Sequence, residues 1–102
     1  MKIIKCMVQD IECELDMAED YAKKAIQYKI DYPDVAQGYI SASSLHLDLM
    51  RNMHEKVVNL ITAYRKEKGE PPAPMMAIYE YMHERFINKA TAVKTLHEMY
   101  KG

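Results

Sequence analysis

The residues that break helices gather at two places in this chain, and they restrict its fold more than any other feature. The first break is Asp31-Tyr32-Pro33-Asp34, where Pro33 disfavours the helical conformation at Tyr32 and suits the first turn of a new helix. The second is Gly69-Glu70-Pro71-Pro72-Ala73-Pro74, in which Gly69 suits a helix C-terminus after a basic stretch. The segments on either side predict three helices, over about residues 3–31, 34–68 and 73–100.

Apolar residues recur at steps of three and four in each segment, which is the spacing of one face of an α-helix. The stripe in the first segment is Ile4, Met7, Ile11, Leu15, Ala18, Ala22, Ala25 and Ile30. No stretch alternates with a period of two for long enough to indicate a strand. Because short connections place successive helices antiparallel, we expect an all-α fold, a single domain over residues 1–102 of three long antiparallel helices.

The charge and cysteine content exclude several classes of partner. Basic and acidic residues are mixed along the chain with a formal net charge of -1, which gives no reason to expect nucleic acid or an anionic membrane. No apolar run approaches the length of a membrane span. Cys6 and Cys13 lie in one predicted helix about 10 Å apart, too far for a disulfide. Unpaired thiols suit a reducing compartment, so we expect a cytoplasmic protein.

Several acidic residues and histidines interrupt or border the apolar stripes. Glu14 continues a seven-residue series on the first helix, and His46 continues one on the second. Matching levels between antiparallel helices predicts two polar layers, one of Glu12, His54 and His83, the other of Glu19, His46 and His97. Carboxylates and imidazoles facing one another in a bundle suit iron, manganese or zinc. The candidate metal ligands are therefore Glu12, Glu14, Glu19, His46, His54 and His83.

Each of these residues also has a purely structural interpretation. A histidine at the edge of a helical core is more often hydrogen-bonded than metal-bound, and Glu14 is more often paired with a Tyr, Lys or Arg side chain. Glu80 and His83 have the spacing of a Glu-x-x-His motif, but Glu80 points away from the expected core. The serines at positions 41, 43 and 44 have no evident partner base. We therefore expect no catalytic residues and favour a protein that is not an enzyme.

Part of the chain resembles a known family. The stretch Ala18–Ala25, then Tyr28-Lys29, Asp31, Pro33 and Val35-Ala36, followed by Met53-His54-Glu55, resembles the first helical hairpin of small rubrerythrin-like proteins in the ferritin-like superfamily. The likeness covers about the first sixty residues. It implies a ferritin-like helical hairpin plus a third helix, as in small ferritin-like proteins of bacteria or their phages.

The resemblance also implies where metal would bind, and here the chain departs from the pattern. Active members carry a Glu on the first helix and a Glu-x-x-His on the second, which together bind two irons. The first helix offers Glu12, Glu14 and Glu19. In the second, no Glu precedes His46 or His54 by three residues, so a complete di-iron set does not carry over.

Two functions remain open at this point. Ferritin-like sites need four helices and one chain supplies three, so we expect a homodimer or higher homo-oligomer in which two first hairpins pair. The first interpretation is a non-catalytic helical interaction or structural module that needs no cofactor. The alternative is a redox or storage protein that binds iron or another divalent metal between its helices.

Overall fold

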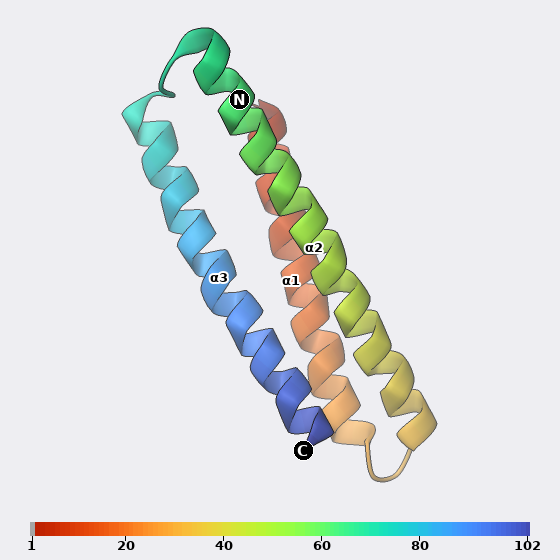
Figure 1. Ribbon diagram of the computed structural model, residues 1–102. Helices are drawn as coiled ribbons and strands as arrows, with labels where there is room; N and C mark the ends of the chain where they lie inside the picture. Colours follow the sequence, from red (N-terminus) through yellow and green to blue (C-terminus); the bar gives the residue numbers. More distant parts are fainter. Residues whose placement is uncertain (1) are drawn as a thin grey trace.

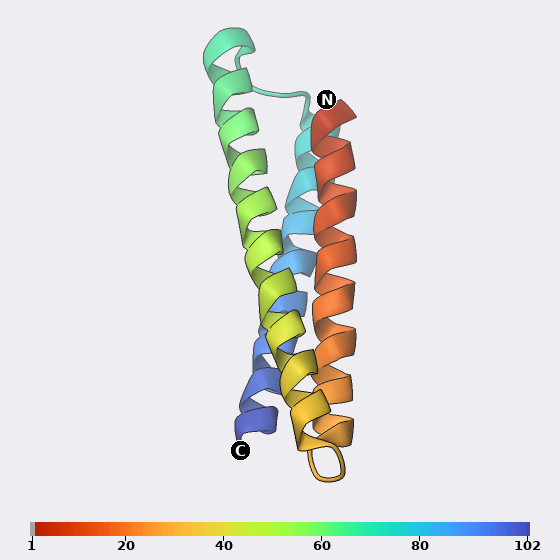
Figure 2. The same cartoon turned by 90° about the vertical axis from the view of Figure 1, so that its right-hand side faces the viewer.

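Three long helices form an elongated bundle in the computed structural model, which describes residues 2–102 (Figure 1). Helix α1 spans Lys2–Tyr28, α2 spans Pro33–Lys68 and α3 spans Ala73–Lys101. Each helix runs antiparallel to the next, so α1 and α3 are parallel (Figures 1 and 2). The bundle measures 56 × 18 × 17 Å. Residues 2–102 contain no strand, and the predicted all-α fold is confirmed.

The helix boundaries lie within three residues of the predicted ones. Helix α1 ends at Tyr28, earlier than expected, and a tight turn follows in which the Tyr32 N–H donates to the Tyr28 carbonyl at 2.8 Å. Ile30 therefore lies beyond the helix and is 91% exposed, so its prediction as a stripe residue was wrong. Helix α2 ends where Gly69 adopts φ 81° and donates its N–H to the Arg65 carbonyl at 3.0 Å. Glycine tolerates this left-handed conformation without a Cβ clash.

Helix α1 is the central element of the bundle. It packs along both neighbours, with the larger share against α2, whereas α2 and α3 touch only weakly. Its buried residues follow the predicted stripe and are Ile4, Ile11, Leu15, Ala18, Ala22 and Ala25. Helix α3 contributes only Phe86 and Val93 as buried residues, and it packs mainly against α1.

The size of the buried side chains changes along the bundle. Near the connection between α1 and α2 they are small, and Ala18, Ala22, Ala25, Ala36 and Ser43 are all 0% exposed. Small residues allow helix backbones to approach closely. Toward the other end the core consists of larger side chains such as Ile4 and Ile61. The bundle is therefore closed tightly at one end and more open at the other.

Candidate functional site

A carboxylate and an imidazole meet at the seam between α1 and α2. Glu14 Oε2 lies against His46 Nδ1, and the two side chains are only 18% and 17% exposed. The Tyr21 ring lies beside His46, with centroids 5.5 Å apart, and stacks on Tyr39 at 5.8 Å. The sequence predicted a Tyr, Lys or Arg partner for Glu14, and this was wrong because the antiparallel register brings His46 level with it.

A buried serine connects all three helices. Ser43 Oγ of α2 donates to the Ala18 carbonyl of α1 at 2.6 Å and lies 2.7 Å from His97 Nε2 of α3. A hydroxyl has one proton, and this one is donated to Ala18, so Ser43 Oγ accepts from the Nε2–H of His97. His97 is therefore a donor here and not a base. No partner for Ser43 was evident in the sequence, and the contact is a structural link and not a nucleophilic pair.

Three rings stack between α2 and α3. His54 and His83 have centroids 5.0 Å apart at an interplanar angle of 17°, and Tyr79 stacks on His83 at 5.9 Å. His54 Nε2 is buried and has no hydrogen-bond partner among the described residues. Burial lowers the pKa of His54, and the neighbouring His83 lowers it further. This environment favours the neutral imidazole at position 54.

The predicted polar layers form only in part. The first layer brings His54 and His83 together, but Glu12 pairs with Arg85 of α3 at 2.8 Å. The second layer does not form, because Glu19 pairs with Lys23 along its own helix at 3.4 Å and His97 pairs with Ser43. Level matching missed the partner of His46 by five residues, about one and a half helical turns, since Glu14 contacts His46 where Glu19 was expected.

The candidate ligands do not fit the di-iron centre that the resemblance implies. Within residues 2–102, no three side chains of His, Cys, Asp or Glu are grouped so that they could hold a metal ion. Glu12 and Glu14 are engaged by Arg85 and His46. The nitrogen lone pairs of an imidazole lie in its ring plane, so the nearly parallel rings of His54 and His83 do not aim at one point. We therefore derive no metal chemistry from this arrangement.

One face of the α1/α2 hairpin is left uncovered by α3. Residues seven apart lie on nearly the same side of a helix. Two such series, one on each helix, lie beside the Glu14–His46 contact. They are on the side opposite to Glu12 and Asp16, which pair with α3. The series are Ile3, Asp10, Met17 and Lys24 on α1, and Val35, Ala42, Leu49 and Lys56 on α2. We call these eight residues the hairpin open face. Its large apolar members are exposed: Ile3 and Val35 by 51%, Met17 and Leu49 by 41%.

Comparisons of the chain with protein-family models, with curated proteins and with solved structures found no match. Across residues 2–102, none of the helices combines the length and the apolar character that a membrane crossing requires.

Proposed function

We propose that this chain is a non-catalytic helical interaction module that self-associates through its hairpin open face. The supporting observation is the repeated exposure of Ile3 and Met17 on α1, and of Val35 and Leu49 on α2, on one side of the molecule. Single exposed apolar residues are common on soluble proteins, whereas several on one face indicate an interaction surface. Pairing two hairpins this way yields the four-helix arrangement that the ferritin-like resemblance implies.

The occupant of this face is a second copy because the face is complementary to itself. The contacts of Glu14 with His46 and of Tyr21 with Tyr39 set the register of the hairpin. In that register Met17 is level with Ala42, Asp10 with Leu49, and Lys24 with Val35. A two-fold axis across the helices at the level of Met17 therefore pairs Met17 with Met17 and Ala42 with Ala42.

The same axis also matches four further residues of the face. It places Asp10 opposite Lys24 of the second copy, and Val35 opposite Leu49 of the second copy. Apolar side chains thus meet apolar ones, and each acid meets a base. An isologous dimer requires this self-complementarity, whereas an unrelated partner would not. Lys24 already pairs with Asp20 of its own helix at 3.0 Å, an exposed contact that leaves it free to exchange partners.

Charge reversal tests this register directly. Sedimentation velocity at micromolar concentration should show a dimer for the unchanged chain. Asp10→Lys places two lysines opposite each other and Lys24→Asp places two aspartates opposite each other, so each variant alone should be a monomer. An equimolar mixture of the two restores both opposite-charge pairs and should dimerise. Glu80→Lys, an exposed reversal on α3, should not change the association.

Two results would contradict the proposal. A monomeric unchanged chain at these concentrations would exclude self-association as its function. A dimer that survives in both single variants would place the interface on another face. Circular dichroism of each variant shows whether it has kept its helices. In the mixing experiment the expected result is the recovery of dimerisation, which misfolded variants would not produce.

A further inference from the structure

The open end of the bundle contains an apolar pocket. Its volume is about 410 Å³, within the range of about 300–1,000 Å³ typical of small-molecule sites. It lies between the N-terminal halves of the parallel helices α1 and α3, and Ile61 of α2 forms part of its wall. The other lining residues are Ile4, Lys5, Val8, Pro74, Met75, Met76, Ile78, Tyr79 and Met82. The pocket exists because the small residues that close the bundle are confined to the opposite end.

The polar groups of the pocket carry positive charge or donate hydrogen bonds. Lys5 is the only charged residue among the ten that line it. Burial raises the pKa of Tyr79, with nearby Arg65 acting in the opposite direction, so its phenol stays protonated and can donate. The N-termini of α1 and α3 lie at this same end (Figure 2), and neither has an acidic residue in its first turn. Their helix dipoles add to the positive potential of Lys5.

We infer that this pocket binds an aliphatic carboxylate, such as a free fatty acid of medium chain length. The acyl chain would lie between Ile4 and Val8 on one side and Met82 on the other, and the carboxylate would meet the Lys5 ammonium. Between Pro74 and Met82 the α3 wall is about 12 Å long at 1.5 Å per residue, which limits the chain to medium length. The methionines suit such a ligand, because their flexible side chains adapt to irregular apolar shapes.

This inference does not depend on self-association. The lining residues of the pocket and the eight residues of the hairpin open face have no member in common. The pocket lies on the side of the hairpin that α3 covers, and the open face lies on the other side. A dimer formed through the open face therefore leaves the pocket accessible.

Calorimetric titration with three probes of equal chain length tests the charge preference. Decanoate, kept below its micelle concentration, should bind the full-length chain with a stoichiometry of one. Decanol should bind about fivefold more weakly, because a partly exposed ion pair contributes up to about 1 kcal/mol. Decyltrimethylammonium should bind most weakly. Equal affinity for the anionic and cationic probes, or the lack of any binding of decanoate, would overturn the inference.

Charge reversal at the pocket provides the matched variant. Lys5→Glu should weaken decanoate binding about tenfold and leave decanol binding nearly unchanged, whereas Lys94→Glu on the exposed side of α3 should change neither. Lys5 is exposed, so its replacement should not disturb folding. Equal weakening of decanoate and decanol would show that Lys5 supports the fold and does not bind the carboxylate.

Methionine methyl resonances locate the ligand. In a carbon–proton correlation spectrum, decanoate should shift the methyl signals of Met75, Met76 and Met82, which line the pocket. The signals of Met17 and Met99, which are exposed elsewhere, should not move. Shifts confined to the latter pair would place the ligand outside the pocket. The same titration on Asp10→Lys should give the same shifts, so failure of the binding site and failure of self-association are distinguishable.

Binding to phosphatidylglycerol vesicles without binding of free decanoate would indicate a membrane surface as the ligand and contradict the inference.

Discussion

The Nε2–H of His97 on α3 donates a hydrogen bond to the buried hydroxyl of Ser43 on α2 at 2.7 Å. The hydroxyl in turn donates a hydrogen bond to the Ala18 carbonyl of α1 at 2.6 Å, so two consecutive hydrogen bonds join the three helices. Burial lowers the pKa of His97, Lys101 and Arg51 lower it further, and Glu98 acts in the opposite direction. This chain lies in the closed half of the bundle, where small residues bring the helix backbones together.

Replacement of Ser43 by alanine should destabilise the fold. The change removes the acceptor of His97 and leaves its N–H unsatisfied, which costs about 1–3 kcal/mol. Urea unfolding followed by circular dichroism measures the difference. Ser44→Ala, one residue along on an exposed position, is the matched control and should change the free energy of unfolding by less than about 0.5 kcal/mol. Equal effects of the two substitutions would show that the hydrogen bond contributes nothing.

The stability of the fold should fall as the pH is lowered below neutrality. Burial lowers the pKa values of His54 and His97 in the folded state below the ordinary value of 6.5. The unfolded chain then binds more protons than the folded chain in this range, so acid favours unfolding. The contribution of the two histidines is fully present above pH 6.5 and is lost as the pH falls through their folded pKa values.

A variant without these two imidazoles isolates their contribution. The double change His54→Gln and His97→Gln keeps a side-chain N–H donor for Ser43 but removes both titrating rings. Urea unfolding from about pH 7.5 to about pH 5 should show a smaller loss of stability in this variant than in the unchanged chain. All other ionisable groups are the same in both proteins, so their effect cancels in the comparison. Identical pH dependence of the two proteins would contradict the prediction.

The Glu14–His46 pair should show strong coupling in a double-mutant cycle. Glu14→Leu or His46→Leu alone leaves the other half-buried polar group without its partner, and each should cost about 1–3 kcal/mol in the free energy of unfolding. The double substitution removes both groups and should recover much of that loss, because leucines at these positions continue the apolar seam. Purely additive losses would show that the two side chains do not interact in solution.

The helices were predictable from the sequence because few residues determine them. Pro33 and Gly69 mark the helix breaks in a chain whose apolar residues otherwise follow the helical period, and local sterics determine where these breaks occur. The end of α1 was predicted three residues too late. No glycine or proline lies between Tyr28 and Asp31, so the sequence there permits a further turn of helix, and Pro33 disfavours the helical conformation only at Tyr32.

The polar contacts were less predictable because they depend on register to within one helical turn. Reflection about the connections placed Glu19 near His46, but the observed partner is Glu14, five residues away. The seven-residue series that contain Glu14 and His46 carried the correct signal, since both mark the seam between α1 and α2. Ser43 gave no such signal, because its role depends on α3 reaching the hairpin with His97 in place.

The two cysteines report on the proposed dimer. A two-fold axis level with Met17 places the Cys13 residues of two copies about 12 Å apart along the helix axis, but the Cys6 residues about 33 Å apart. Both thiols are exposed. A short bismaleimide should therefore cross-link Cys6→Ser, which retains Cys13, and should fail to cross-link Cys13→Ser. Cross-linking of both variants to the same extent would contradict this register.

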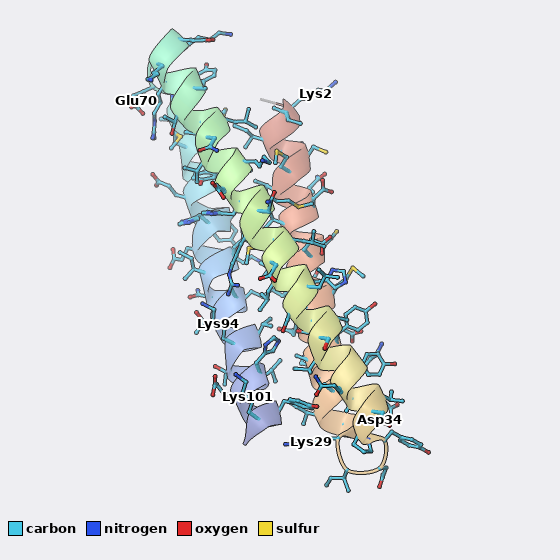
Figure 3. All side chains as sticks on the ribbon, turned by 45° about the vertical axis from the view of Figure 1, so that its right-hand side comes forward. Lys2, Lys29, Asp34, Glu70, Lys94 and Lys101 are labelled. Atoms are coloured by element: carbon cyan, nitrogen blue, oxygen red, sulfur yellow. The ribbon has the colours of Figure 1, made fainter. Side chains whose placement is uncertain are left out.

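Helix α3 should separate from the hairpin before the hairpin itself unfolds. Phe86 is 5% exposed and is one of only two buried residues that α3 contributes, and α3 packs mainly on α1. Figure 3 shows the side chains of all three helices. Phe86→Ala should cost about 3–5 kcal/mol at this contact. Hydrogen exchange should then show α3 amides losing protection while those of α1 and α2 retain most of theirs. Ile87→Ala changes a neighbouring residue that is 52% exposed and should leave the exchange pattern unchanged. A uniform loss of protection across all three helices after Phe86→Ala would show that the bundle unfolds as one unit.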